Sequence, residues 1–151
     1  MIRKRLASVD DPVIYDLIQK ELLPHTQRFF PDMQLTRKEL KKRLAYSDVY
    51  MYTRVDNGRT VAFMSIHEIP GQRMFIDMLA VEKGNQGHGI GRKLMKKAEA
   101  AAVRKGCKEI HLFVNEDNYA AISFYEKLGF QRVQYDGRRH IFIMLKATGL
   151  K

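Results

Sequence analysis

The alternation of apolar and polar positions along the chain predicts four helices and seven strands. In the helical segments apolar side chains recur every three or four residues, as one buried helix face requires. We expect these helices over residues 11–23, 36–46, 91–105 and 118–128. Runs of β-branched and aromatic residues predict strands over residues 2–7, 49–55, 60–67, 74–81, 109–114, 130–135 and 140–145. This order is typical of an α/β (α+β) domain with a single mixed, mostly antiparallel central sheet flanked by helices.

Capping and turn residues mark several of these boundaries. Asp10, Asp11 and Pro12 supply a cap and a first-turn proline for the first helix. Thr36 and Glu39 have the spacing of a capping box before the second helix. Hairpin turns are expected at residues 56–58 and 136–137, and glycines at positions 106 and 129 should end the last two helices.

Composition favours one globular domain over residues 1–151. The chain has 151 residues, 45% of them hydrophobic, which is enough to bury one continuous core. No apolar run approaches the roughly 20 residues of a membrane-spanning helix, so no membrane partner is expected. The first residues lack the apolar stretch of a secretory signal, which predicts a cytoplasmic protein.

The net charge of +10 is compatible with nucleic acid, anionic membranes or phosphate-bearing small molecules. The basic residues are spread over several predicted helices, as on solvated helix faces, so nucleic acid is not expected as the main partner. The single cysteine, Cys107, cannot form an internal disulfide, and no zinc-ligand spacing is present. No metal is therefore expected.

The segment Gln86-Gly87-His88-Gly89-Ile90-Gly91 lies between a buried strand and the strongest predicted helix. Backbone amides at such a position converge on an anion. The helix begins with Arg92 and Lys93 and has no capping side chain before it, two defects that a bound anion would offset. Neither a Walker ending nor Gly-x-Gly-x-x-Gly is present. A phosphate cradle of another kind is predicted, with a flexible glycine turn as the alternative.

A second group of residues lies on the last predicted helix. Helical spacing places Asn118, Ala121 and Tyr125 on nearly one face, so Asn118 and Tyr125 can reach the same cleft. Taken singly, Asn118 reads as a helix cap and Tyr125 as a core aromatic.

Together the two segments resemble the GNAT superfamily of N-acetyltransferases. The glycine segment matches the superfamily's Gln/Arg-x-x-Gly-x-Gly/Ala signature, and residues 118–130 match its later motif, Asn-x-x-Ala-x-x-Phe-Tyr-Glu-Lys-Leu-Gly-Phe. The resemblance covers nearly the whole chain and is weakest over residues 8–47. It implies the GNAT-like acyl-CoA fold, with acetyl-CoA as co-substrate.

The resemblance also implies roles for individual residues. Amides of Gly87, His88, Gly89, Ile90, Gly91 and Arg92, after Gln86, would bind the coenzyme A pyrophosphate. The backbone of Leu79, Ala80 and Val81 would pair with the pantetheine arm like an added strand. Asn118 would hold the same arm, and Tyr125 would lie near the thioester sulfur.

The amine acceptor must lose a proton, because a free alkylamine has a pKa near about 10.4. Asp77 is the only acid inside an apolar strand, and strict alternation places it on one face with Phe75, Leu79 and Val81. We therefore predict Asp77 as the base or amine anchor, with a paired structural carboxylate as the alternative. Acids that would serve through water are Glu68, Glu21 and Asp32.

The remaining steps need a donor for the oxyanion and one for the leaving thiolate. A backbone amide of a bulge at residues 79–81 would meet the oxyanion, and Tyr125 would protonate the thiolate. Cys107 has no positioned histidine to activate it, which favours direct transfer over an acetyl-enzyme.

These residues predict an acetyl-CoA-dependent N-acetyltransferase acting on a primary amine of a small molecule, peptide or protein. A coenzyme A-binding regulatory module without catalysis is the alternative, and a basic nucleic-acid binder is a third hypothesis. The identity of the amine stays open, and a homodimer is compatible with the sequence.

Overall fold

A seven-stranded sheet runs through the structure, a computed structural model that describes residues 1–151. The strands are β1 (Ile2–Lys4), β2 (Asp48–Thr53), β3 (Thr60–Ile69), β4 (Arg73–Val81), β5 (Glu109–Asn115), β6 (Gln131–Asp136) and β7 (Ile141–Ala147). Their order in the sheet is β1-β2-β3-β4-β5-β7-β6. Every neighbouring pair is antiparallel except β4 and β5. The predicted mixed, mostly antiparallel sheet is confirmed.

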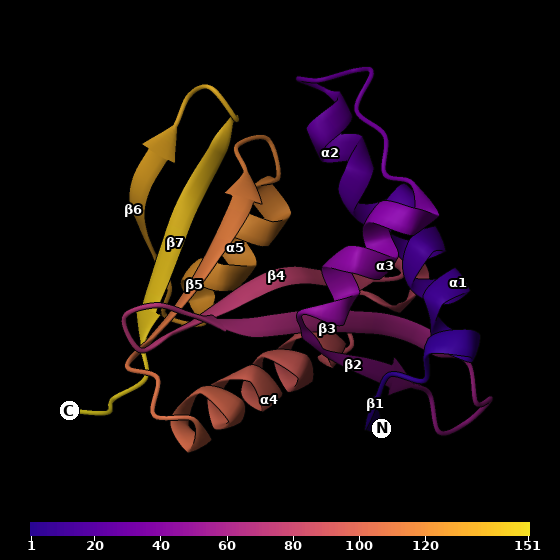
Figure 1. The fold of residues 1–151 in the computed structure, drawn as a ribbon, viewed down its shortest axis with the longest axis horizontal. Coiled ribbons are helices and arrows are strands. Elements are labelled where there is room, and N and C mark those ends of the chain that lie inside the picture. Colours follow the sequence, from indigo (N-terminus) through magenta and orange to yellow (C-terminus); the bar gives the residue numbers. More distant parts are fainter.

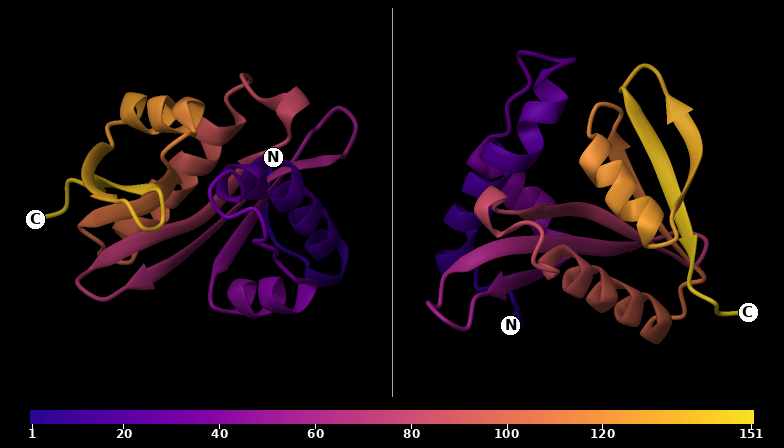
Figure 2. Two further views of the ribbon diagram at one scale, coloured as in Figure 1. Left: turned by 90° about the horizontal axis from the view of Figure 1, so that it is seen from above. Right: turned by 180° about the vertical axis from the view of Figure 1, so that it is seen from behind.

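Helices cover both faces of this sheet (Figures 1 and 2). On one face lie α4 (Ile90–Arg104) and α5 (Tyr119–Lys127), whose apolar side chains share one core with the strands. On the other face lie α1 (Ala7–Leu17), α2 (Leu23–Gln27) and α3 (Arg37–Ala45), which share a second core with β2, β3 and β4. The two faces of the sheet are therefore covered by different helices.

The sheet opens between β4 and β5. The two strands pair in parallel only from Arg73–Glu109 to Ile76–Leu112. Beyond this point β5 rises away from β4 together with β7 and β6, as Figure 1 shows. The second half of β4 therefore pairs with β3 alone, and its other edge faces the opening.

Strand β4 carries a bulge at the point where this opening starts. Ser65 pairs with Met78 and Ile66 pairs with Ile76, so Asp77 has no partner on β3. An extra residue of this kind interrupts the alternation of side chains along a strand.

The bulge corrects one prediction from the sequence. Strict alternation placed Phe75, Asp77, Leu79 and Val81 on one face. In the structure Leu79 and Val81 pack against the core that contains α4, whereas the Asp77 side chain reaches Arg43 of α3, on the opposite side of the sheet. The prediction was wrong because the extra residue shifts the phase of the strand by one.

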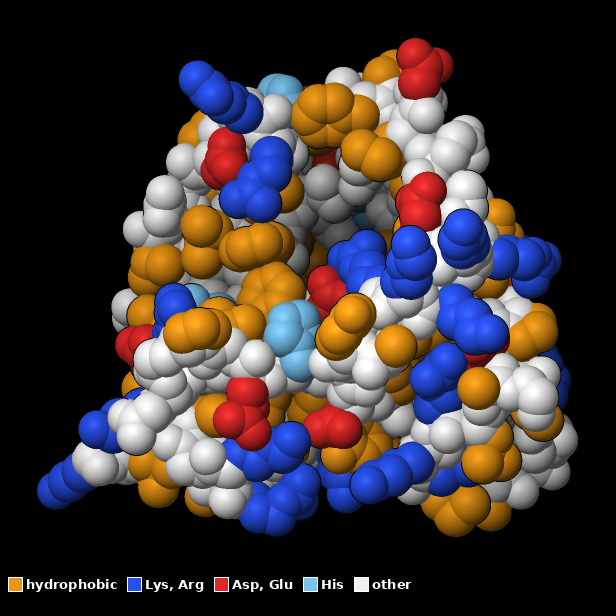
Figure 3. All heavy atoms as spheres, viewed as in Figure 1, with side chains coloured by type: hydrophobic (Ala, Val, Ile, Leu, Met, Phe, Trp, Pro, Cys, Tyr) orange, Lys and Arg blue, Asp and Glu red, His pale blue; other side chains and the backbone are white.

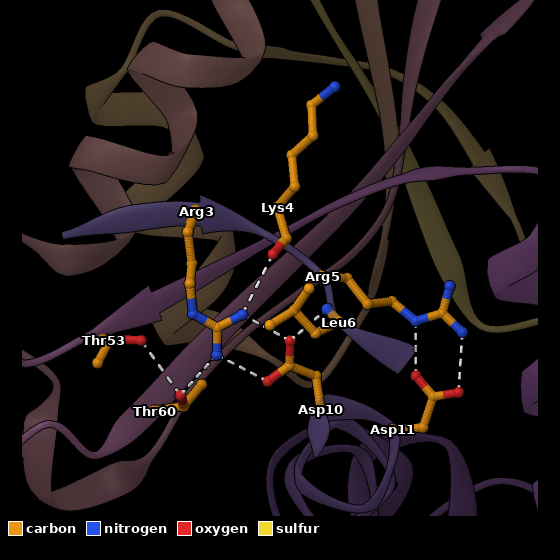
Figure 4. Close-up of polar contacts among 8 residues, drawn as sticks. All are labelled: Arg3, Lys4, Arg5, Leu6, Asp10, Asp11, Thr53 and Thr60. Atoms are coloured by element: carbon orange, nitrogen blue, oxygen red, sulfur yellow. Dashed lines mark hydrogen bonds and ion pairs between the residues drawn. The ribbon is translucent and has the colours of Figure 1, made fainter. Parts of the chain in front are cut away.

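The first helix starts one turn earlier than predicted, at Ala7 in place of Asp11, and a π-helical turn (Ile18–Leu22) separates it from α2. The reason is the buried Asp10 carboxylate, which accepts hydrogen bonds from the Leu6 backbone N–H at 2.7 Å and from Arg3 at 2.7 and 2.8 Å (Figure 4). Pro12 consequently lies inside the helix. The capping box of α3 is confirmed on one side, since Thr36 Oγ1 accepts the Glu39 N–H at 3.1 Å.

Candidate active site

The glycine-rich loop enters α4 through two residues in the left-handed region. Gly87 has φ 82° and Gly89, the residue that precedes the helix, has φ 79°. A Cβ on either would meet nothing within 4 Å, so conformation and not space calls for glycine here. No side chain caps the first turn of α4. Its free amides, in an exposed loop, can bind an anion.

Gly91 has a different role, which the sequence did not indicate. A Cβ at this position would lie 3.1 Å from Phe124 Cζ. The absence of a side chain lets the start of α4 lie against Phe124 of α5. Glycine at position 91 therefore allows the loop to lie close to the motif over residues 118–130.

Polar contacts hold the loop and the turn that precedes it (Lys83–Asn85) to their surroundings. Gln86 Nε2 donates to the Val81 carbonyl at 2.9 Å, which ties the loop to the end of β4. Glu21 Oε2, in the π-helical turn, accepts the Lys83 N–H at 2.7 Å. The Gln86 side chain therefore braces the loop, and Glu21, one of the alternative bases, already caps a backbone group.

The segment Leu79–Val81 presents a free strand edge to the opening. Its residues pair with Met64, Phe63 and Ala62 of β3 and have no partner on β5. An extended molecule can add to such an edge by main-chain hydrogen bonds. The bulge lies at Asp77, not at residues 79–81 as expected.

Asn118 and Tyr125 lie at the start and near the end of α5. Asn118 precedes the helix and its Oδ1 accepts the Ala121 N–H at 3.2 Å, so the expected capping role is present. Its amide nitrogen makes no hydrogen bond within the chain and is free for a ligand.

Tyr125 lies in the core shared by α4, α5 and the sheet, 5.2 Å from Phe124 and 5.7 Å from Phe130 between ring centroids. Its hydroxyl has no hydrogen-bond partner in the chain, and the residue as a whole is 8% exposed. Burial raises the pKa of Tyr125 well above its ordinary value. The phenol therefore keeps its proton at neutral pH and can act as a donor.

Asp77 is engaged by an arginine that the sequence had assigned to a solvated helix face. Arg43 Nε and Nη2 donate to the two Asp77 carboxylate oxygens, each at 2.8 Å. The Asp77 side chain is 11% exposed and that of Arg43 47% exposed. Since the partners are 34 residues apart in sequence, no local pattern could reveal the pair.

The β6–β7 hairpin and the end of α2 meet across the opening. Phe29, just after α2, stacks on His140 of the hairpin, with ring centroids 4.1 Å apart. His140 Nδ1 lies 2.7 Å from Glu116 Oε1, and the Tyr135 hydroxyl donates to Glu116 as well. These hydrogen bonds lower the pKa of Glu116, because they stabilise its charged form. The sequence analysis did not identify this cluster.

Two of the other acids named from the sequence, Glu68 and Asp32, are exposed. Glu68 is 54% exposed and lies 3.7 Å from Lys105, and Asp32 is exposed in a loop. Cys107 is buried, and burial raises the pKa of its thiol, which disfavours a nucleophilic thiolate.

A surface pocket of about 620 Å³ lies between the end of α2, α5 and β6–β7, but no residue of β4 or of the glycine loop lines it. This pocket is therefore separate from the β4–β5 opening. No group of three or more His, Cys, Asp or Glu side chains has a geometry that would hold a metal ion. None of the helices has the length and apolar character needed to cross a membrane.

Comparison with known proteins agrees with this geometry. The sequence profile described as "Acetyltransferase (GNAT) family" matches residues 14–130. N-alpha-acetyltransferase 30 of Schizosaccharomyces pombe is 33% identical over 127 residues, which are 74% of this chain and 83% of that protein. Matches to two further proteins of the same name cover only 44% and 21% of their lengths.

Solved structures show the same fold. The ribosomal-protein-S18-alanine N-acetyltransferase of Escherichia coli aligns with a TM-score of 0.78 at 21% identity, over 100% of this chain and 95% of that one. The PaiA N-acetyltransferase of Thermoplasma acidophilum, in complex with coenzyme A, aligns with a TM-score of 0.78 at 20% identity, over 97% and 99%. The chain belongs to the acetyltransferase (GNAT) family and is an enzyme that transfers an acetyl group to an amine.

Proposed function

We propose that the protein transfers the acetyl group of acetyl-CoA directly to the α-amino group of a peptide or protein N terminus. The observation that carries the acetyl-CoA part of this proposal is the free edge of Leu79–Val81 beside the uncapped, glycine-rich start of α4. An extended pantetheine arm and its pyrophosphate need these two features, and they meet at one opening of the sheet.

Coenzyme A would bind on the side of the sheet that carries α4 and α5. The amides from Gly87 to Arg92 would hold the pyrophosphate, since the positive end of a helix favours an anion. The free amide nitrogen of Asn118 supports its proposed contact with the pantetheine arm. The thioester would then lie near the bulge at Asp77, where β4 and β5 separate.

The acceptor amine would approach from the opposite side, between α2–α3 and the β6–β7 hairpin. Its nitrogen attacks the thioester carbonyl carbon, the C–S bond breaks, and the thiolate takes a proton. The Tyr125 phenol, which is protonated at neutral pH, would be that donor. The transfer needs no covalent enzyme intermediate, which agrees with the buried Cys107.

The group that removes the proton from the amine is a prediction from the sequence. Both Asp77 oxygens already accept hydrogen bonds from Arg43, which supports the alternative of a paired carboxylate. We therefore propose that the amine proton leaves to water, and that Asp77 acts on the site through Arg43. A homodimer and a cytoplasmic location likewise stay predictions from the sequence.

The choice of an α-amino acceptor rests on the names of the relatives, two of which act at an N-terminal or alanine amine. The test is a thiol-release assay with acetyl-CoA and three acceptors: a peptide with a free N terminus, the same peptide blocked at its N terminus but containing lysine, and a polyamine. Turnover with the free N terminus alone supports the proposal. Preference for lysine or polyamine would contradict it while leaving acetyl transfer intact.

A further inference from the structure

Two arginines border an aromatic surface on the acceptor side of the sheet. Phe75 of β4 and Phe113 of β5 pack edge to face, with ring centroids 4.9 Å apart, and His67 packs on Phe75 at 5.4 Å. Arg43 lies at one end of this surface, through its bond to Asp77, and Arg139 lies at the other. The two arginines come from α3 and from the β6–β7 hairpin.

The guanidinium of Arg43 is held in place by Asp77, but not all of its donors have a partner. Asp77 follows Phe75 by two residues, a rise of about 7 Å along a strand. It binds Nε and Nη2 of Arg43, while Nη1 has no partner in the chain. The hydrogen bond to Asp77 raises the pKa of Arg43, so the guanidinium is always charged. A planar guanidinium held by one carboxylate keeps donors for a second acceptor.

Arg139 is held in a similar way. Its Nε donates to Asp136 at 2.7 Å, and its guanidinium lies 5.1 Å above the centre of the Phe113 ring. Both of its Nη atoms lack a partner in the chain, and its side chain is 56% exposed. Stacking on the ring fixes the plane of the guanidinium and leaves its outer edge toward solvent.

The wider surface around the two arginines is also cationic. Helix α3 carries five basic residues and one acid over Arg37–Ala45, and of the five only Arg43 forms an ion pair. Figure 3 shows these basic side chains on one side of a hollow in this face, with further basic side chains on the hairpin across it. An acceptor entering here meets positive charge from both sides.

We propose that Arg43 and Arg139 select acceptors that carry a carboxylate close to the reacting amine, namely peptides with an acidic residue directly after the first. The inference rests on the proposed function and specifies the charge of the preferred acceptor. Apolar parts of the peptide lie over Phe75 and Phe113, and the free guanidinium edges at the two ends of this surface attract the carboxylate. Lysine-rich N termini are repelled by the same charges.

The test compares matched peptides that differ only in Asp or Asn at the second position. For the parent protein we expect kcat/KM to be about tenfold or more higher with the Asp peptide, the usual effect of a charge-assisted hydrogen bond. Arg43→Gln and Arg139→Gln should each remove most of this preference, chiefly by raising KM for the Asp peptide. Lys42→Gln is the control, because it removes one exposed, unpaired charge from α3 without changing this surface.

Equal kcat/KM for the Asp and Asn peptides in the parent protein would overturn the inference. An equal loss of kcat/KM for the Asp and Asn peptides in each arginine variant would also overturn it. Such a loss would be a general defect of the enzyme and not a loss of preference for the carboxylate. If a melting curve shows that Arg43→Gln does not fold, the inference is still tested by Arg139→Gln and by the comparison of the Asp and Asn peptides in the parent protein. Absence of turnover with every amine would instead contradict the proposed function.

Discussion

The phenol of Tyr125 illustrates how burial sets the chemistry of a single residue. The residue is 8% exposed within an apolar core, and burial raises its pKa because the anionic form would be poorly solvated there. A group of this kind does not serve as a base at neutral pH. It can donate a proton to a thiolate and recover it from water after the product leaves.

We therefore expect Tyr125→Phe to lower kcat by about 100-fold, the usual contribution of a general acid, with little change in coenzyme A affinity. The substitution deletes the donor and keeps the ring that packs on Phe124 and Phe130. Steady-state kinetics and calorimetric titration with coenzyme A separate the two effects. If kcat stays within about twofold of the parent, water and not Tyr125 protonates the leaving thiolate.

For Asp77→Asn we expect a similar fractional loss of rate at every pH, together with a lower melting temperature. The reason is that the carboxylate is bonded to Arg43 through both oxygens and holds that side chain in place. Rate against pH for variant and parent, with melting curves in the same buffers, makes the comparison. A rate deficit confined to neutral pH that recovers as the pH rises would instead make Asp77 the base.

At the scale of elements, the start of α4 was well predicted from sequence because its signals are local. Three glycines in six residues, the missing cap and the adjacent cations all lie within one segment. The start of α1 was not well predicted, since Asp10 is bound by Arg3 from β1 and not by its own helix alone. A capping residue whose partner comes from another element cannot be distinguished from an ordinary one by spacing.

Charge reversal at the start of α4 tests the anion site. Arg92→Glu should weaken coenzyme A binding about tenfold or more, because it places a carboxylate beside amides proposed to hold phosphate. Lys96→Glu, one turn further along the same helix and exposed, is the matched control and should have a much smaller effect. Calorimetry measures both affinities. Equal weakening in the two variants would indicate general attraction by the basic surface and no defined site.

The ion pair between Arg3 and Asp10 should make the free energy of unfolding depend on pH. Burial of Asp10 opposes its charge, but hydrogen bonds from Arg3 and the Leu6 N–H outweigh it and lower the pKa of Asp10. A carboxyl with a lowered pKa stabilises the fold above its ordinary pKa of about 3.9, and this contribution is lost as the pH falls through the folded value.

Asp10→Asn should accordingly reduce the free energy of unfolding by about 3 kcal/mol at neutral pH, since one partner of a buried pair is removed. The difference from the parent should shrink as the pH falls below about 4. Urea unfolding at several pH values measures it. A constant difference down to strongly acidic pH would show that the charge of Asp10 is not involved.

For the whole molecule, the separation of β4 from β5 brings distant segments to one site. The sequence predicted the strands, the sheet and the two motifs, because each has a periodicity or a spacing of its own. It did not predict the bulge at Asp77, the partner of Asp77, or the contact between Phe29 and His140, since each depends on how residues far apart in the chain meet. The elements that carry the two motifs were therefore more predictable than the contacts between distant segments.

The measurement that most directly tests the account is initial-rate kinetics of thiol release with acetyl-CoA and a peptide bearing a free N terminus, both concentrations being varied. Direct transfer at the opening requires both substrates to be bound together, so double-reciprocal plots should intersect, and mass spectrometry should locate one acetyl group on the N-terminal amine. Parallel plots with an acetylated enzyme, or coenzyme A binding without acetylation of any amine, would contradict it.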